Sequence, residues 1–564
     1  MRNKGKKFPP HLWAVMAIIT TFLFIASPVA AQTGNLNRPY EPVILTGKDF
    51  PEFSNNAAAM TQLFLYKYSG NMWTQIPFQF DEVEPDSATP TNPTYFRRGD
   101  GKLDDQDELV LMACDAGDKA PSNAWINDAS ALTSQRYEIE LTDPVNSNRG
   151  YVYLFRSTTL SIGPTVKDYV TYVVPPSSTP GRDIVRGQSY EEGHLDNGLN
   201  NSLFVPVSEN GSGASFLERL KLRFQINIGV PLTFNEDNFN LLPPIRFQDG
   251  RTRVIRELRE RISLFGTNID FPILIRYYGY STVLGTSLNL TSLPATVRVT
   301  LLRQSVDFAA NINGAKWYNQ NVTTAITVTG ATGNLNAAQG AVVVEPNLNW
   351  YMMSSAHGSY INIFSLPANL GTTRRFYFHD AASASNDGTD DTGDNKSYGD
   401  SGFLATATSE ITKTTYNLLV TSYILGKDQP RTVAETLHNQ ATRPLMRITQ
   451  SQRNTVAVRE NTNVVPLRFV LLQNSPNPLS LTTPSTTIRY ELPFASHVTV
   501  SLRIFNLLGQ NVRELVNAVQ GAGQYEAQWD GRMENGARAQ AGIYFYQLRA
   551  SNQVATQKLM LLNR

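Results

Sequence analysis

The sequence has a single cysteine, Cys114, in 564 residues. A chain with one cysteine has no internal disulfide, so an exported form of it must be stabilised by buried apolar surface. Cys114 ends the apolar run ELVLMAC, which predicts a small buried side chain. The alternative, a reactive nucleophile, finds no histidine near it in the sequence.

Charge is also scarce, at 17% of the residues, and neither sign dominates. Without the four basic residues at positions 2, 4, 6 and 7, the 49 basic residues become 45 against 48 acidic ones, a formal charge of −3. So small a charge provides no basic surface for the phosphates of nucleic acid or for an anionic membrane. We therefore expect no nucleic acid among the partners.

Catalytic motifs are absent from the sequence. None of the six histidines lies in HExxH or at another two-histidine metal spacing, and there is no GxSxG elbow, P-loop or GxGxxG fingerprint. No catalytic residue can be named on this basis. A glycosidase needs only two carboxylates that face each other across a cleft, and the 48 acidic residues leave that open.

One long apolar run occurs, from Leu12 to Ala26, directly after the basic N-terminal residues. Val29 and Ala31 are small residues at the −3 and −1 positions that signal peptidase reads, so residues 1–31 are predicted to be a signal peptide. The alternative is an anchoring helix, but the run is shorter than the ~20 residues that a span needs. We expect no integral membrane span in the mature chain.

What the chain does contain is typical of an extracellular all-β protein. Aromatic residues reach 10%, Thr, Ser, Asn and Gly are frequent, and Lys and Glu are few. Alternating or β-branched runs such as 136–142, 150–157 and 295–303 are bounded by Gly, Pro, Asn and Asp. The predicted fold class is all-β, with several β-sandwiches in one chain.

Composition divides the predicted mature chain into four regions. An N-terminal β-rich module (32–180) ends in a Pro/Ser stretch, and a larger β-sandwich module (181–426) follows. A short helix near 431–439 and a polar linker fill 427–467, and a C-terminal module spans 468–564. Two stretches, SFLERLKLRF and TRVIRELRERISLF, have apolar residues near helical spacing and fit either a helix or a strand.

The last module has the pattern of a small immunoglobulin-like sandwich. Ile488, Tyr490 and Leu492 share one face of a strand, and 498–504 alternates in the same way. NLLGQ and WDGRMENG are turn regions. AGIYFYQL and the apolar tail TQKLMLL supply the closing strands, so burial in a sandwich accounts for the tail.

Motifs in this module resemble, in order, the C-terminal sorting domain of cargo for the type IX secretion system and the related flagellar hook-capping immunoglobulin-like domain. They are LLQNSPNP, TTIRYELP, VTVSLRIFNLLGQNVREL, WDG, AGIYFYQL and TQKLMLL. The resemblance covers the last ~95 residues, about a sixth of the chain. The residues selected from these motifs are Asn474, Pro476, Asn477, Pro478, Gly509, Trp529, Asp530, Gly531 and Gly542. Ser475 stands where the family usually has an aromatic residue, and extra residues separate NPLS from TTIRY.

The resemblance implies export in two steps. A signal peptide leads the chain to the periplasm of a Gram-negative-type bacterium, and outer-membrane secretion machinery then reads the C-terminal module. The implied localisation is extracellular or at the cell surface. The alternative is a terminal adhesive or structural immunoglobulin-like domain without a sorting role, because a fold does not fix a function.

Two acidic loops are candidates for calcium, the one cofactor that the sequence suggests. In RRGDGKLDDQDELV, the residues Asp100, Gly101, Leu103, Asp104 and Asp107 fit positions 5, 6, 8, 9 and 12 of an EF-hand-type loop. Positions 1 and 3 hold Phe and Arg, which supply no carboxylate. The alternative is an Asp-Gly turn with solvated carboxylates.

The second acidic loop spans 379–402 and crowds carboxylates among Gly, Ser and Asn. Its candidate calcium ligands are Asp387, Asp390, Asp391 and Asp394. A bound cation would relieve their mutual repulsion, at the weak affinity of extracellular calcium sites. The spacing fits no established calcium loop, and a flexible solvated loop is the alternative.

Two functions of different classes fit these observations. In the first, the body is a non-catalytic secreted or surface protein that binds glycans or other envelope components, or forms a structural layer. In the second, it is an extracellular carbohydrate-active enzyme, a hydrolase or lyase, delivered by the same route. The lack of catalytic motifs and of a (β/α)8 pattern favours the first.

Exposed aromatic residues would provide surfaces for sugar rings, and 275–281 and 347–353 are rich in Tyr or Trp. Burial in a core is the alternative for most of them. Tyr277, Tyr278 and Tyr280 cannot all face inward along one strand, because neighbouring side chains alternate. We expect at least one of the three to be exposed or at an interface.

Overall fold

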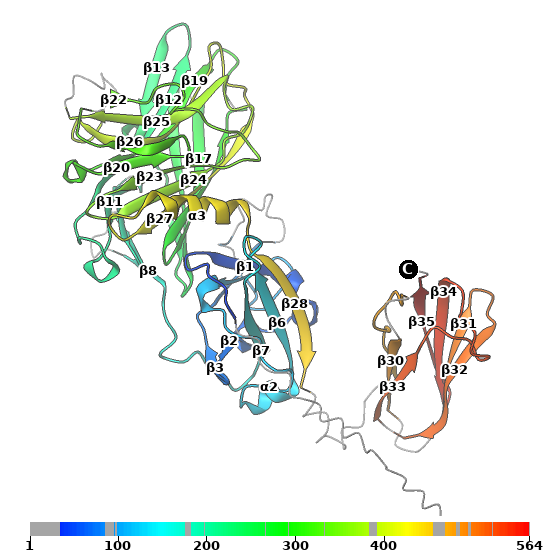
Figure 1. Ribbon diagram of the computed structural model, residues 1–564. Coiled ribbons are helices and arrows are strands. Elements are labelled where there is room, and N and C mark those ends of the chain that lie inside the picture. The colour runs from blue at the N-terminus through cyan, green and yellow to red at the C-terminus, as the bar shows by residue number, and fades with distance from the viewer. Residues whose placement is uncertain are drawn as a thin grey trace, which may run out of the picture. The chain divides into compact units, whose positions relative to one another are not determined.

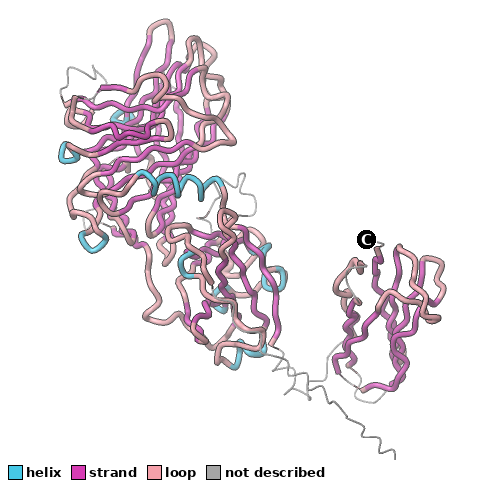
Figure 2. Tube along the Cα trace, viewed as in Figure 1, coloured by secondary structure: helices cyan, strands magenta, loops and turns pink. Residues whose placement is uncertain are grey.

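The structure, a computed structural model, describes residues 34–84, 95, 99–174, 182–196, 198–264, 267–291, 293–331, 333–382, 392–454, 469–480, 485–493, 498–521 and 523–562. The predicted signal peptide (1–31), residues 455–467 of the predicted linker, residue 468 of the predicted C-terminal module, and Asp387, Asp390 and Asp391 lie outside these ranges. The chain forms two compact units, 1–453 and 454–564. Strands make up most of the ordered elements in both, which confirms the all-β prediction (Figure 2).

The first sandwich of unit 1 combines a three-stranded and a five-stranded sheet (Figure 1). The smaller has the order β1-β5-β4, with β1 Pro42–Thr46, β4 Gln79–Asp81 and β5 Glu108–Met112. The larger has the order β28-β6-β7-β2-β3, with β2 Leu63–Ser69, β3 Met72–Gln75, β6 Gln135–Thr142, β7 Arg149–Arg156 and β28 Met446–Arg453. Short helices lie in the connections: η1 Gly47–Asp49, α1 Pro51–Ser54, η2 Met60–Gln62, η3 Ala113–Asp115 and α2 Ala129–Thr133.

Strand β28 belongs to this first sandwich, although the whole second sandwich separates it from β7 along the chain. It pairs antiparallel with β6 over its full length, from Met446 opposite Thr142 to its last residue. Leu445, just before it, lies in the core of the first sandwich. Residues 449–453 lie within the helix-and-linker region predicted for 427–467. Residues 449–453 form an edge strand instead, because backbone pairing with β6 holds a segment that has few apolar side chains.

The second sandwich of unit 1 is larger. Its six-stranded sheet has the order β13-β12-β19-β26-β25-β22, with β12 Leu217–Asn227, β13 Pro231–Asn235, β19 Arg298–Phe308, β22 Gly333–Asn334, β25 Thr373–Ala381 and β26 Ser397–Thr406. Its ten-stranded sheet has the order β14-β16-β17-β18-β27-β24-β23-β20-β21, with β15 paired to β16. Those strands are β14 Asn240–Leu241, β15 Arg246–Gln248, β16 Arg253–Leu264, β17 Thr267–Tyr278, β18 Ser281–Asn289, β20 Lys316–Asn319, β21 Val322–Thr327, β23 Asn349–Ser354, β24 Ser359–Phe364 and β27 Thr415–Leu425.

A four-stranded sheet, β11-β10-β9-β8, accompanies this sandwich, with β8 Val170–Val173, β9 Ile184–Gly187, β10 Glu191–His194 and β11 Asn200–Phe204. Helical turns η4 Val207–Glu209, η5 Glu236–Asn238 and η6 Ala310–Ile312 lie in its connections. Helix α3, Arg431–Thr442, confirms the helix predicted near 431–439. Its Ala434 and Leu437 pack on Trp350 and Ile361 of the ten-stranded sheet.

Both stretches that fit either a helix or a strand are strands. SFLERLKLRF contributes most of β12, and TRVIRELRERISLF contributes β16. Strand β16 pairs with β17 along its whole length, and β12 pairs with both β13 and β19. Tertiary pairing therefore decides a local pattern that the sequence left open.

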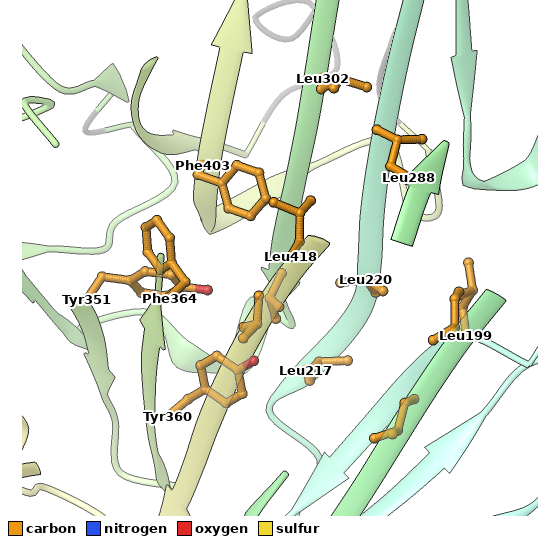
Figure 3. Packing of buried hydrophobic residues seen from close by; sticks show 14 of the residues in the cluster. Leu199, Leu217, Leu220, Leu288, Leu302, Tyr351, Tyr360, Phe364, Phe403 and Leu418 are labelled. Carbon is orange, nitrogen blue, oxygen red and sulfur yellow. The ribbon is translucent and has the colours of Figure 1, made fainter. Parts of the chain in front are cut away.

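The core of the second sandwich lies between its two large sheets (Figure 3). Leu302 and Phe403 come from the six-stranded sheet, and Leu288 and Leu418 come from the ten-stranded sheet. The rings of Phe364 and Phe403 are stacked with their centroids 5.4 Å apart. The alternation of apolar and polar residues along each strand directs these side chains to one face.

The second unit is a smaller sandwich with its own core. A three-stranded sheet, β29-β30-β33, holds β29 Val470–Leu471, β30 Thr486–Leu492 and β33 Gly523–Trp529. A four-stranded sheet, β32-β31-β34-β35, holds β31 Val498–Asn506, β32 Asn511–Gln520, β34 Gly542–Ala550 and β35 Gln553–Leu561. Ile488, Leu502 and Tyr546 are fully buried in its core. In neither unit does a described helix combine the length and apolarity that crossing a membrane requires.

Candidate functional site

Asn477, from the NSPNP motif, binds the last strand of the second unit. Its side-chain Nδ2 donates to the carbonyl of Lys558 at 3.3 Å, and its Oδ1 accepts from the backbone N–H of Met560 at 2.9 Å. Leu479 continues this contact as a parallel bridge to Leu561. Because β35 is at the end of its sheet, these contacts satisfy backbone groups of an edge strand.

Asn474 connects the same motif to the core and is only 2% exposed. Its Nδ2 donates to the carbonyl of Pro476 at 3.1 Å and to Oγ1 of Thr486 at 2.8 Å, and its backbone N–H donates to the hydroxyl of Tyr546 at 2.8 Å. Pro476 and Pro478 each follow a cis peptide bond. The structure therefore gathers four of the selected residues in one segment that organises the end of the sandwich.

The WDG motif forms a turn that Trp529 anchors in the core. Trp529 is buried, and its Nε1 donates to the carbonyl of Arg532 at 2.8 Å. The carboxylate of Asp530 accepts a hydrogen bond from the backbone N–H of Arg532 at 3.1 Å. Gly531 has φ +74°, a conformation that favours glycine. Gly542 begins β34, opposite Leu561.

The NLLGQ turn presents apolar side chains at the surface of the second unit. Gly509 has φ +76° at the turn after β31. Leu507 and Leu508 precede it, and their side chains are 67% and 83% exposed. These two adjacent leucines form a small exposed apolar surface at this turn.

The first acidic loop uses its carboxylates to hold its own backbone. Asp107 is 2% exposed and accepts from the backbone N–H groups of Asp104 at 2.7 Å and Val83 at 3.0 Å. Asp100 accepts from the N–H of Lys102 at 2.9 Å. Burial raises the pKa of Asp107 to about 6, although the two N–H groups act in the opposite direction. Across the described ranges, no three His, Cys, Asp or Glu side chains form a metal-binding group, and calcium binding by this loop stays a prediction.

Of the second acidic loop's candidate ligands, Asp394 is the one that the structure describes. Its Oδ1 accepts from the backbone N–H of Lys396 at 2.9 Å. Nearby in the fold, Lys221 pairs with Asp307 at 2.6 Å, both fully buried. Burial and the adjacent Asp400 raise the pKa of Asp307, against the effect of the Lys221 ammonium. Lys221, Asp307 and Asp400 come from β12, β19 and β26, three adjacent strands of the six-stranded sheet.

The Tyr- and Trp-rich stretches are mostly core. Tyr277 and Tyr278 are 0% and 1% exposed, and Trp350 is 3% exposed. Tyr280 is half-buried and its ring lies 5.0 Å from that of Tyr40 in the preceding segment of unit 1. This confirms that one tyrosine of the three lies at an interface. The aromatic residues of these stretches leave little flat surface for sugar rings.

Cys114 differs from its predicted environment. The residue is exposed rather than buried. It follows the buried Ala113 in the helical turn η3, and its Sγ lies 3.4 Å from the hydroxyl of Tyr169. The apolar run thus ends one residue earlier than the sequence indicated.

A buried ionic network connects the four-stranded sheet to β16. Arg256 donates to both carboxylate oxygens of Asp183, at 2.8 and 2.9 Å. His194 Nδ1 lies 2.8 Å from the same carboxylate, and its Nε2 lies 3.2 Å from Glu192. Burial opposes the ionised form of Asp183, but His194 and Arg256 together hold its pKa well below the usual range. The groups satisfy one another, which indicates a structural network.

Glu260, also on β16, has a buried carboxyl group. It is 0% exposed, and neither carboxylate oxygen has a hydrogen-bond partner among the residues that the structure describes. Burial raises its pKa to about 8, although the positive charge of Arg256 acts against this. Glu260 is therefore protonated at neutral pH.

An apolar cavity of about 100 Å³ lies between the two large sheets. Its lining is Leu220, Leu222, Arg223, Phe224, Phe239, Phe271, Ile273, Leu284, Thr286, Leu288, Leu302, Arg303, Gln304, Leu370, Phe403 and Leu418. In Figure 3, Leu288, Leu302, Phe403 and Leu418 converge on the space between the sheets. Protein interiors are close-packed, so an unfilled apolar space leaves the atoms of its wall without some van der Waals contacts.

A second pocket, of about 440 Å³ and lined by both polar and apolar groups, lies at the ten-stranded sheet. Its lining is Thr286, Ser287, Glu345, Ser365, Pro367, Asn369, Thr415, Tyr416, Asn417, Leu418 and Leu419. Thr286 and Leu418 line both spaces. We call this second pocket the outer pocket and the apolar space the inner cavity.

The outer pocket exists because a strand ends early. Pairing of β24 with β27 stops at Phe364 opposite Val420, whereas β27 pairs with β18 as far as Thr415. Residues 415–419 of β27 therefore lack a strand on the β24 side, and the loop after β24 supplies Ser365 and Asn369 there. Sequence reasoning missed this site. Its one sequence signal is the alternation of polar and apolar residues in TYNLLV.

A third space closes the far side of the inner cavity. It has about 40 Å³ and shares Leu220, Leu284 and Gln304 with the cavity. Tyr360 and Ser422 line it and hydrogen-bond to each other at 2.7 Å. Of these three spaces, the outer pocket contains one carboxylate, Glu345, and the third contains one, Glu192. None of the three unites two carboxylates.

Comparison of sequences identifies one family. Residues 477–553 match the FlgD Ig-like domain family. The match covers most of the second unit and none of the first. No curated protein matches the chain.

Solved structures give only distant likenesses. They include an α-mannosidase from Enterococcus faecalis V583 (8% identity, 88% of this chain and 55% of that chain, TM-score 0.39). The α-N-acetylgalactosaminidase NagBb from Bifidobacterium bifidum is 10% identical (50% of this chain and 39% of that one, TM-score 0.30). PorZ, a surface component of the type-IX secretion system of Porphyromonas gingivalis, is 13% identical (72% and 61%, TM-score 0.14). The chain spans about half or less of the length of the first two, and at these TM-scores no activity is assigned.

Proposed function

We propose that this chain is a non-catalytic surface or secreted protein, exported through its C-terminal unit, whose β-sandwich body binds a glycan-bearing envelope component in the outer pocket. The observation that carries the export proposal is the folding of the selected motif residues into a separate unit with its own core. The N-terminal segment with the features of a signal peptide supports the first export step.

The glycan proposal rests on the chemistry of the outer pocket. Amide, hydroxyl and carboxylate groups, the types that hydrogen-bond to sugar hydroxyls, come from Glu345, Asn369, Asn417 and Ser287. Its volume is within the ~300–1,000 Å³ of small-molecule sites. An enzyme that hydrolyses glycosides needs a second facing carboxylate, which this pocket lacks.

The export proposal is tested in a bacterium with a type IX secretion system. Deletion of 469–564 is expected to leave the chain in the periplasm, and fusion of this segment to a folded reporter with a signal peptide is expected to bring the reporter to the surface. Normal release of the truncated chain would contradict the proposal.

A second export experiment distinguishes recognition of the C-terminal unit by the secretion machinery from correct folding of that unit. Replacing Leu507 and Leu508 by serine keeps the turn, since both side chains are exposed and outside the core. We expect this double variant to fold normally and to be exported severalfold less. Replacing exposed Val519 by serine is the matched control and should leave export unchanged.

A further inference from the structure

We propose that the side chains of Lys221 and Asp307 condense to an amide, which joins two neighbouring strands of the second sandwich covalently. Lys221 lies on β12 and Asp307 on β19, and these strands pair antiparallel. The Nζ of Lys221 lies 2.6 Å from Oδ2 of Asp307, and both side chains are fully buried. The amide would provide a link between strands that a chain with one cysteine cannot make as an internal disulfide. This inference is independent of the proposed export and glycan binding.

The register of the two strands brings the amine and the carboxyl together. Lys221 is opposite Ser305, so Asp307, two residues further along β19, is its diagonal neighbour on the same face of the sheet. The Nζ also donates to the carbonyl of Lys396 and to Oγ of Ser397, each at 3.4 Å. These contacts hold the amine beside the carboxyl from the opposite side.

Burial favours condensation of this pair over a lasting ion pair. Water stabilises an ammonium and a carboxylate, and groups removed from water resist ionisation. Burial and the charge of Asp400 raise the pKa of Asp307 well above its ordinary range, although the Lys221 ammonium acts in the opposite direction. When the proton of the ammonium passes to the carboxylate, Nζ has a free lone pair and the carboxyl has a hydroxyl that can leave as water.

Asp400 supplies the third group of the site. It is fully buried on β26, the strand next to β19. Neither of its carboxylate oxygens has a hydrogen-bond partner among the residues that the structure describes. A buried carboxyl without a partner costs stability, so its place beside the pair calls for a function. Glu218, the other acid that acts on Asp307, instead accepts the backbone N–H of Asp394 at 2.8 Å.

The condensation needs no oxidant, reductant or co-reactant. The lone pair of the Lys221 Nζ attacks Cγ of Asp307, and a C–N bond forms. The Asp400 carboxylate takes one proton from the nitrogen and passes it to the hydroxyl of the former carboxyl group. The C–O bond then breaks and one water molecule leaves. The product is a neutral amide, so the buried site no longer holds the charges of the ammonium and the carboxylate.

The mass of the purified chain tests the proposal. Mass spectrometry under denaturing conditions should give a mass one water molecule below that of the sequence. Trypsin does not cleave after an acylated lysine, so a branched peptide should join 220–223 to 304–316. Lys119 is the internal control, because its Nζ lies 3.1 Å from Glu138 but its side chain is 40% exposed, and it should carry no crosslink. A full mass with cleavage after Lys221 would overturn the proposal.

Variants separate the chemistry from the fold. Lys221→Arg keeps a cation beside Asp307 but lacks the amine, so the full mass should return. In a time course after cell-free synthesis, Asp400→Asn should crosslink about 100-fold more slowly than the wild type. Asp237→Asn is the matched control, since this exposed aspartate pairs with Arg219 on the same strand, and its rate should equal that of the wild type.

Thermal melting checks that each variant is folded before the rates are compared. An equal rate for Asp400→Asn and the wild type would overturn the role of this carboxylate. A branched peptide that persists in Lys221→Arg would overturn the assignment of the lysine. The digest of the wild type decides the existence of the amide independently of how the variants fold.

Discussion

Asp183 and Arg256 form a two-point ion pair inside the second sandwich, with N–O distances of 2.8 and 2.9 Å. Asp183→Asn would leave a buried guanidinium without its counter-charge, so we expect the free energy of unfolding to fall by roughly 3–5 kcal/mol. Urea denaturation at pH 7 measures it. The exposed Asp196, paired with Arg182, is the matched control, and Asp196→Asn should change stability little.

The same ion pair predicts that the free energy of unfolding decreases at acidic pH. The folded-state pKa of Asp183 is lowered, so its contribution is present above its ordinary unfolded pKa and disappears as pH falls below it. We expect the wild type to lose stability below about pH 4 more steeply than Asp183→Asn. Parallel curves for the two proteins would show that this carboxylate is not ionised in the fold.

Glu260 predicts the opposite dependence on pH. Its folded-state pKa of about 8 lies above the unfolded value, so its contribution is complete below about pH 4.5 and is lost as pH rises through 8. Over this window the free energy of unfolding should fall by roughly 1.4 kcal/mol per pH unit from this group. Glu260→Gln should remove that slope, whereas Glu257→Gln on the same strand should keep it. Denaturation between pH 5.5 and 8.5 measures the difference.

Asn477→Ala tests the contact between the NSPNP motif and β35. The variant loses hydrogen bonds to Lys558 and Met560, and we expect a loss of about 1 kcal/mol in the second unit. Hydrogen exchange of peptides covering 553–562 should accelerate severalfold. Asn517→Ala, an exposed asparagine of the same unit, should leave exchange there as in the wild type.

Asp107→Ala tests the first acidic loop. Because its carboxylate accepts two backbone N–H groups, we expect a loss of about 1–3 kcal/mol in both the presence and the absence of millimolar calcium. Exposed Asp105→Ala is the control and should be neutral. A rise in melting temperature with calcium in the wild type that disappears in Asp107→Ala would instead establish an ion site.

The sequence predicts the class of fold well and the arrangement of the body poorly, for identifiable reasons. Apolar and polar residues alternate in 136–142 and 498–504, and this pattern predicts both strands correctly without information on their pairing partners. Arg256 and Glu260, by contrast, share the inward face of β16 with Val254, and burial of two charged residues there blurs the two-residue period. The local pattern does not show that β16 pairs with β17, and this pairing is what makes residues 253–264 a strand rather than a helix.

The outer pocket depends on strand register. Leu418 looks like an ordinary core residue in the sequence, and Asn417 looks like an ordinary exposed one. The pocket adjoins the part of β27 that continues past the end of β24 at Phe364. No residue type encodes that mismatch, whereas the C-terminal motif is readable because its asparagines and prolines are contiguous.

The pairing of β6 with β28 delays closure of the first sandwich. About 300 residues separate the two strands, and at the ~5–20 residues per second of synthesis this segment takes on the order of 15–60 s to make. Until then the outer edge of β6 has no partner, and the sheet that it ends is incomplete. The five-stranded sheet can therefore be completed only late in synthesis, and the large sequence separation of β6 and β28 raises the contact order of the first sandwich, which is associated with slow folding.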